Sequence, residues 1–327
     1  GEYDYKKNIQ LFKDFKEKFL KTGNPRFDYI NFIKRKKIKI KRHKKKIIIV
    51  PSFFTIARSY RIADNLYRRR KVKNRGLANE KAWMEYTSLK SKETFDLLSL
   101  IYEIKEKFKK LEMEIWVHPK ENIDNWKKII PEDNTLKYRT DKNFESISSK
   151  DTLFIHSGST LVLDIMMMNF MVYYFRPIKN SFNQIPVFNL SKIANKKKKI
   201  LEIIKNFYFT RNFKPKKTNN NLEKYIHNFD SNILASKEIS NYFEELKNKD
   251  LSLKNKLFKN NVLKLYLKNY FRSLRYKINK KIYNPKFPPI TKNEIHNLKL
   301  TLTNFDKKFK NLKIELIGPT LIRMRHK

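Results

Sequence analysis

Short runs of β-branched and aromatic residues alternate with amphipathic segments between residues 45 and 177, and this alternation limits the folds open to the chain. The pattern predicts strands at 45–54, 112–119, 134–140, 151–156 and 170–177. Between them it predicts helices at 91–111, 121–130 and 159–169, with a short helix or loop at 143–150. Such alternation favours a mostly parallel sheet, joined by right-handed crossovers and covered on both faces. The predicted fold class is therefore α/β and Rossmann-like.

The clearest of these helices is the one expected at residues 91–111. Its apolar side chains recur every three or four residues, which places them on one face of an α-helix. The predicted buried face consists of Phe95, Leu98, Ile101, Ile104 and Phe108. We expect Ser91 to cap the first turn, because a serine hydroxyl accepts hydrogen bonds from the free N–H groups there.

The pattern differs on both sides of this region. Residues 6–21 have helical spacing, the Gly-Asn-Pro sequence at 23–25 indicates a turn, and the basic run at 34–46 is typical of a solvated linker. Residues 196–283 are basic with mainly helical spacing, and a helix near 291–309 and a strand at 312–318 follow. The predicted parts are a remnant of a preceding domain with its linker (1–44), the Rossmann-like domain (45–190) and a basic, mainly helical C-terminal extension (191–327).

The formal net charge of +43 allows three interpretations. Such a charge favours nucleic-acid binding through counterion release from phosphates. It is also what an AT-rich genome produces, since Lys, Asn, Ile, Phe and Tyr are abundant together while Ala and Gly are scarce. Attraction to an anionic membrane surface is a third interpretation. Composition alone leaves all three open.

Several classes of site are excluded or disfavoured by residue content. The chain has no cysteine, so it has no disulfide, no thiolate zinc site and no cysteine nucleophile. It has neither an H-E-x-x-H nor a D-x-D motif, so we expect no metal and no cofactor. The longest apolar run, 161–175, is interrupted by Asp164 and Asn169 and is too short to span a bilayer. We expect a cytoplasmic protein, with peripheral contact to the inner membrane face as an extension of the charge argument.

Two polar segments follow predicted strands, at 118–122 and 156–160. Ligands of open α/β sheets bind beyond the carboxyl ends of the strands. In the second segment, Gly158 would let the backbone approach an anion, and Ser157, Ser159 and Thr160 would add hydroxyl donors at a helix N-terminus. The alternative is a plain helix cap by Ser157 or Ser159. The pattern alone does not separate a phosphate site from a cap.

The first segment is similarly open. His118 ends a strand, and Pro119 would stop that strand and fix the loop. The imidazole could donate to a phosphate oxygen or act as a general acid, or it could be structural. Glu121 is equally consistent with an acidic residue in a first helical turn, where the helix dipole favours it.

Taken in order, these segments resemble the bacterial surface-carbohydrate biosynthesis proteins, which are relatives of GT-B glycosyltransferases. The resemblance spans roughly residues 1–180. It consists of the junction Gly23-Asn24-Pro25-Arg26-x-Asp28, the strand "IIIVPSFF", the segment "WVHPKEN" with Trp126, and the segment "HSGSTLVLDI". The His-Pro and Ser/Thr elements are also similar to those of sialyltransferases, Kdo transferases and glycerophosphotransferases.

The chain departs from the family pattern at several positions. Trp116 and Val117 stand in place of an Arg-Pro pair, and Ser157 replaces an asparagine. Leu161 and Val162 replace a Thr-Gly pair, and Asp164 replaces a glutamate.

The resemblance implies a GT-B C-terminal domain that binds a nucleotide-activated donor, CMP- or CDP-linked, without metal. It implies His118 as the catalytic residue and an interdomain junction at Gly23, Asn24, Pro25 and Arg26. The implied donor-binding residues are Glu121, Asn122, His156, Ser157, Gly158, Ser159, Thr160 and Asp164.

The expected function is glycosyl transfer in surface polysaccharide biosynthesis, with a saccharide or lipid-linked acceptor. Because the junction lies so near Gly1, the chain is expected to be a truncated donor-binding half that is inactive alone. The alternatives are a basic nucleic-acid-binding protein and a non-catalytic member of the GT-B fold.

Overall fold

The computed structural model describes residues 2–11, 21–35, 44–52, 80–118, 121–140, 144, 147–148, 150–179, 186–210, 221–229, 234–249, 292–305, 310–318 and 321–326. The chain divides into two compact units, Gly1–Glu238 and Ile239–Lys327. Among the described residues, no helix is long and apolar enough to cross a membrane.

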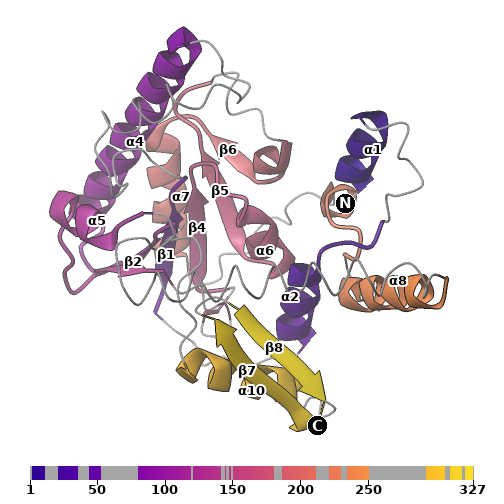
Figure 1. Cartoon of the computed structure of the whole chain (residues 1–327). Helices are drawn as coiled ribbons and strands as arrows, with labels where there is room; N and C mark the ends of the chain where they lie inside the picture. The colour runs from indigo at the N-terminus through magenta and orange to yellow at the C-terminus, as the bar shows by residue number, and fades with distance from the viewer. Residues whose placement is uncertain are drawn as a thin grey trace. The chain divides into compact units, whose positions relative to one another are not determined.

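The first unit is built on a six-stranded, fully parallel sheet (Figure 1). Its strands are β1 (Lys46–Val50), β2 (Glu112–Trp116), β3 (Leu136–Arg139), β4 (Thr152–His156), β5 (Met171–Phe175) and β6 (Lys192–Ala194). They lie in the order β3-β2-β1-β4-β5-β6. This is the Rossmann-type order, so the predicted α/β class is confirmed. The sheet continues past residue 190, because β6 pairs with β5.

Helices cover both faces of this sheet. One core cluster joins Ile47 and Ile49 of β1 to α4 (Glu80–Lys107), α5 (Ile123–Ile129) and α7 (Lys197–Phe209). The other joins Ile48 and Val50 to α6 (Val162–Met167) and α2 (Pro25–Arg35). Successive side chains of a strand point to opposite faces, so β1 has to be apolar throughout. Burial of each such side chain contributes about 1.5–3 kcal/mol.

Two expectations about the long helix were wrong. The helix α4 begins at Glu80, so Ser91 lies inside it and cannot cap its first turn. Leu98, Ile101, Ile104 and Phe108 are buried as expected, but Phe95 is 61% exposed. Phe95 precedes Ile101 by six residues, which places it about 120° around the helix from the centre of the buried face.

Other boundaries also differ from those expected. The first helix, α1, spans Glu2–Leu11, and residues 12–20 of the expected helix lie outside the described residues. The helix α6 is shorter than the expected 159–169. Most of the expected linker, 36–43, and much of the basic region, 250–291, also lie outside the described residues.

The second unit contains the helix α10 (Lys292–Phe305) and an antiparallel pair of strands, β7 (Leu312–Gly318) and β8 (Leu321–His326). The α10 and β7 elements agree with the predicted helix and strand. The strand β8 was not predicted; its arginines alternate with apolar residues in a strand of only six residues.

The junction segment, residues 23–28, forms a turn and the first residues of α2. Gly23 has φ of +86°, and a Cβ there would lie 2.5 Å from Oδ1 of Asn228. The side chain of Asn24 accepts a hydrogen bond from the backbone N–H of Arg26 at 3.0 Å, in the manner of a helix cap. Pro25 is the first residue of the helix, a position whose N–H has no partner within a helix, so the absence of an N–H in proline costs no hydrogen bond there.

The junction segment also contacts two other helices, α6 and α8. Arg26 forms an ion pair with Asp164 of α6. The buried carboxylate of Asp28 accepts hydrogen bonds from the backbone N–H groups of Ala235 (2.9 Å) and Ser236 (2.8 Å). Asp28 therefore caps α8 (Ala235–Lys249) from a segment some 200 residues away in sequence.

Replacing Asp28 by alanine should lower the free energy of unfolding by about 1–2 kcal/mol, because two N–H groups lose their acceptor. The Asp28→Asn variant keeps one carbonyl oxygen and should lose less. Urea unfolding followed by tryptophan fluorescence measures both. Equal stability of the alanine variant and the wild type would contradict the capping role.

Candidate functional site

The carboxyl ends of β2, β1 and β4 lie side by side on one edge of the sheet. Ile49 is in register with Ile115 on one side and with Ile155 on the other. From β1 the chain proceeds outward to β2 and β3, and then crosses back to β4 on the opposite side of β1. The strand order therefore reverses between β1 and β4, and ligands of open α/β sheets bind at such a switch point.

This arrangement brings the two predicted segments to the same edge. His118 follows β2, residues 156–160 follow β4, and only β1 separates the two strands. Two interstrand steps correspond to about 10 Å between backbones. Pro51 and Ser52, which leave β1, lie between the two segments in this order.

Several polar groups of the 156–160 segment are engaged within the protein. The hydroxyl of Ser157 accepts a hydrogen bond from the backbone N–H of Ser52 at 2.8 Å. Gly158 has φ of +111°, in the region that favours glycine, and its N–H donates to Nδ1 of His156 at 3.3 Å. The hydroxyl of Ser159 accepts from the N–H of Leu161 at 3.3 Å.

The outer end of this segment remains open to solvent. Ser159 is half-buried and Thr160 is exposed. Their backbone N–H groups donate to no acceptor in the described part of the chain. Because α6 begins only at Val162 and is six residues long, these two N–H groups, and not a long helix dipole, are the main attraction for an anion.

His156 lies in the interior. Its ring is fully buried and stacks on Tyr174, with the ring centroids 4.8 Å apart. Since Nδ1 accepts from Gly158, the hydrogen-bond network assigns the proton to Nε2, which donates to Oγ of Ser191 at 2.7 Å. Ser191 in turn donates to the carbonyl of Phe188 at 3.1 Å. Burial lowers the pKa of His156 from 6.5 to about 3, so the ring is neutral near pH 7.

Asp164 is also turned inward. It is 1% exposed, and one carboxylate oxygen pairs with Arg26 of α2. The other oxygen has no hydrogen-bond partner. Its predicted role in donor binding stays a prediction, and the structure gives it a structural partner as well.

Glu121 and Asn122 shape the loop that carries His118. The N–H of Glu121 donates to the carbonyl of His118 at 2.8 Å, and Oε2 of Glu121 accepts from the N–H of His118 at 3.3 Å and from Nε1 of Trp126 at 3.4 Å. Asn122 caps α5 by accepting from the N–H of Asp124 at 2.7 Å. His118 itself is half-buried, and Pro119 and Lys120 lie outside the described residues.

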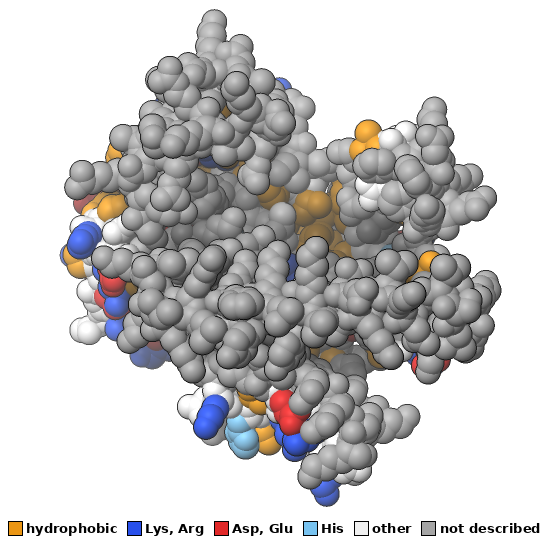
Figure 2. All heavy atoms as spheres, in the orientation of Figure 1, with side chains coloured by type: hydrophobic (Ala, Val, Ile, Leu, Met, Phe, Trp, Pro, Cys, Tyr) orange, Lys and Arg blue, Asp and Glu red, His pale blue; other side chains and the backbone are white. Residues whose placement is uncertain are grey.

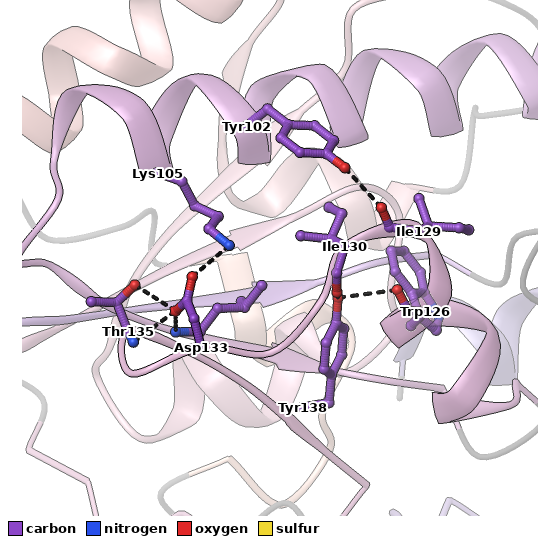
Figure 3. A network of polar contacts seen from close by, with 9 residues as sticks. Tyr102, Lys105, Trp126, Ile129, Ile130, Asp133, Thr135 and Tyr138 are labelled. Carbon is purple, nitrogen blue, oxygen red and sulfur yellow. Dashed lines mark hydrogen bonds and ion pairs between the residues drawn. The ribbon is translucent and has the colours of Figure 1, made fainter.

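A polar network joins the C-terminal end of α5 and the residues that follow it to α4 and β3 (Figure 3). Tyr102 of α4 donates to the carbonyl of Ile129 at 2.7 Å, and Tyr138 of β3 donates to the carbonyl of Ile130 at 2.6 Å. Lys105 pairs with Asp133 at 2.6 Å. The helix α5 that follows the His118 loop is thus tied at its C-terminal end to two neighbouring elements.

The described lysines are partly paired. Blue and red side chains lie next to one another at the left edge of Figure 2, where α5 lies in Figure 1. Lys127 of α5 pairs with Glu132 at 2.8 Å. Lys45 instead donates to the carbonyls of Phe207, Tyr208 and Thr210 at the end of α7, at 2.6, 3.2 and 2.7 Å. An exposed ion pair such as Lys127–Glu132 contributes at most about 1 kcal/mol to the free energy of unfolding.

Neither the position of Ser52 at this edge nor the pairing of Asp164 with Arg26 was predicted from the sequence. Ser52 is two residues past the end of β1, so the rule that selected residues after β2 and β4 would have found it. Arg26 and Asp164 are 138 positions apart in the sequence, so no local sequence pattern predicts their pairing. Among the described residues there is no group of three or more side chains suited to hold a metal ion.

A scan of protein-family models finds no match to the chain, and a search of curated proteins finds none either. Among solved structures, it is similar to a candidate UDP-N-acetylglucosamine 2-epimerase from Listeria monocytogenes, with 12% identity over 70% of this chain and 54% of that one, and a TM-score of 0.35. It is also similar to the UDP-GlcNAc 2-epimerase of Methanocaldococcus jannaschii in complex with UDP-GlcNAc and UDP, with 12% identity, coverage of 67% and 56%, and a TM-score of 0.34. The chain thus spans 54% to 56% of the length of these structures.

Acid should destabilise the protein through His156. Because its folded pKa is depressed to about 3 from 6.5, its contribution to stability is complete above pH 6.5 and is lost as the pH falls toward 3. Relative to a His156→Gln variant, the wild type should lose up to about 1.4 kcal/mol of unfolding free energy per pH unit in this window.

Urea titrations at pH 7, 6, 5 and 4 measure this difference. All other titratable groups are the same in both proteins, so the change in the difference with pH isolates the imidazole. Parallel pH profiles of the two proteins would show that His156 is not buried as a neutral ring.

Proposed function

We propose that the first unit binds the phosphate groups of a nucleotide-activated sugar at the carboxyl edge between β1 and β4. We further propose that the whole protein is a glycosyltransferase, or a related transferase, of surface polysaccharide biosynthesis. The observation that carries the proposal is the switch point, where the His118 loop and the Ser159–Thr160 turn share one edge of the sheet. The resemblance of these segments to surface-carbohydrate biosynthesis proteins supports the same function.

Phosphate would be held by discrete donors. The unengaged N–H groups of Ser159 and Thr160 and the hydroxyl of Thr160 are the groups available in the exposed turn. Asp164, the nearest acidic residue in sequence, is neutralised by Arg26 and does not oppose an anion there. Fixed donors of this kind stabilise developing negative charge without reorganisation and without a metal ion.

His118 is the proposed catalytic residue. It would donate a hydrogen bond or a proton to the phosphate oxygen that leaves as the bond between that oxygen and the sugar breaks. The proposed donor is CMP- or CDP-linked, and the proposed acceptor is a saccharide or a lipid-linked saccharide. The lysine-rich surface would favour peripheral contact with an anionic membrane leaflet on which such an acceptor lies.

Isothermal titration of the chain with CMP, CDP, UDP and UDP-GlcNAc tests the binding step. We expect one of these ligands to bind, and the His118→Ala and Thr160→Ala variants to bind it about tenfold more weakly, because each loses a hydrogen bond to a charged group. Binding should be unchanged by EDTA. Thr303→Ala is a matched control, since the Thr303 hydroxyl donates to the carbonyl of Lys299 in the second unit.

Binding assays on the wild type, with nucleotides and with single-stranded nucleic acid, distinguish the proposal from its main rival. Absence of nucleotide binding, together with tight binding to single-stranded nucleic acid that weakens steeply with salt, would favour a nucleic-acid-binding protein, for which the net charge of +43 speaks. Nucleotide binding that neither His118→Ala nor Thr160→Ala weakens would overturn the site assignment.

A further inference from the structure

Five buried side-chain atoms in the described part of the chain have no hydrogen-bond partner. They are Oγ of Ser52, Oγ1 of Thr87, Oδ1 of Asp164, the hydroxyl of Tyr174 and Nε of Arg176. Buried polar groups are nearly always paired, so each such atom needs an explanation. An unpaired buried hydroxyl costs about 1–3 kcal/mol.

Ser52 differs from the other four in its position. It is two residues past the end of β1, the strand at which the sheet order reverses, and it is only 7% exposed. Its Cβ is 3.7 Å from the point where a Cβ on Gly158 would lie. The Cβ of Ser52 is therefore in contact range of the turn that leaves β4, and in the strand order β1 lies between the two strands that carry the proposed phosphate site.

The backbone of Ser52 is fixed by the neighbouring strand. Its N–H donates to the hydroxyl of Ser157 at 2.8 Å, and the N–H of Ser157 donates to the carbonyl of Val50 at 3.2 Å. These two bonds tie the loop after β1 to the loop after β4. The Ser157 hydroxyl thus accepts a hydrogen bond from within the protein. The Ser52 hydroxyl, whose backbone is held by that bond, has no hydrogen-bond partner of its own.

We propose that the Ser52 hydroxyl is a direct ligand of a phosphate oxygen of the nucleotide donor, and that Ser157 is a positioning residue that holds Ser52 there. This inference rests on the proposed function and refines its site. It reverses the expectation for Ser157, from a ligand to a support, and it adds a residue from the loop after β1 to the two loops already assigned.

The experiment compares a nucleoside diphosphate with the corresponding nucleoside. The Ser52→Ala variant should bind the diphosphate about tenfold to a hundredfold more weakly, since it loses a hydrogen bond to a charged group. It should bind the nucleoside as the wild type does, because the nucleoside has no phosphate. Its thermal unfolding midpoint should be no lower than that of the wild type, since the lost hydroxyl has no partner in the protein.

Two further variants separate support from direct contact. Ser157→Ala should weaken diphosphate binding and lower the unfolding midpoint as well, and Ser157→Thr should restore both because it keeps the Oγ acceptor. Thr87→Val is the matched control, since it removes another unpaired buried hydroxyl, located on α4. It should leave diphosphate binding unchanged.

Each outcome has a definite meaning. If the wild type binds no nucleotide, the proposed function fails and this inference fails with it. If the wild type binds the diphosphate and Ser52→Ala binds it equally well, only the role of Ser52 is overturned. A Ser52→Ala protein that unfolds at a clearly lower temperature, or that loses nucleoside and diphosphate binding equally, would show a structural role and would also overturn it.

Discussion

The pairing of β1 with β2 on one side and β4 on the other is the constraint on which the rest of the first unit depends. Because all three strands are parallel, their carboxyl ends meet at one edge. Residues Lys46–Ile49 of β1 pair with β2 and residues Lys46–Val50 pair with β4, so both neighbours are held in register with the same strand. The loops after these strands are therefore held in fixed relative positions by the core.

Much of the chemistry at this edge is used to build the edge itself. After β4, hydrogen bonds join Gly158 to His156 and Ser157 to the backbone of Ser52. After β2, Glu121 accepts from the N–H of His118 and closes the turn, and Asn122 caps the next helix. The physical reason is that a polar group near a sheet edge loses water and needs a partner. What remains for a ligand is the smaller set of groups that the protein leaves unpaired or exposed.

In the junction segment, too, polar groups are used to hold the unit together. Within six residues, Gly23 admits a close approach of Asn228, Arg26 pairs with Asp164, and Asp28 caps α8. A motif that the family resemblance places between two domains has a complete structural role within this unit. Asp164, which the same resemblance assigns to donor binding, forms an ion pair with Arg26 of this segment.

The fold class was predictable from the sequence, whereas the details of the site were not. Apolar runs located strands such as β1, β4 and β5, which are buried on both faces and therefore nearly continuous in hydrophobicity. In β3 only alternate residues are buried. The three-residue strand β6 has no such run, and its place depends on pairing with β5. The helix α4 was longer than expected because its polar first half carries little apolar periodicity, and Phe95 was misplaced because the true centre of the buried face lies nearer Ile101.

The sequence by itself determined that this chain forms a parallel α/β sheet and that polar segments follow β2 and β4, because hydrophobic periodicity and strand-end polarity are local properties. Only the tertiary structure decided that the two segments share an edge, that His156 and Asp164 face inward, and that Ser52 follows the strand that lies between theirs, with its hydroxyl unpaired. Those outcomes depend on strand order and on partners such as Ser191 and Arg26, which are far away in the chain and are brought close by packing of the core.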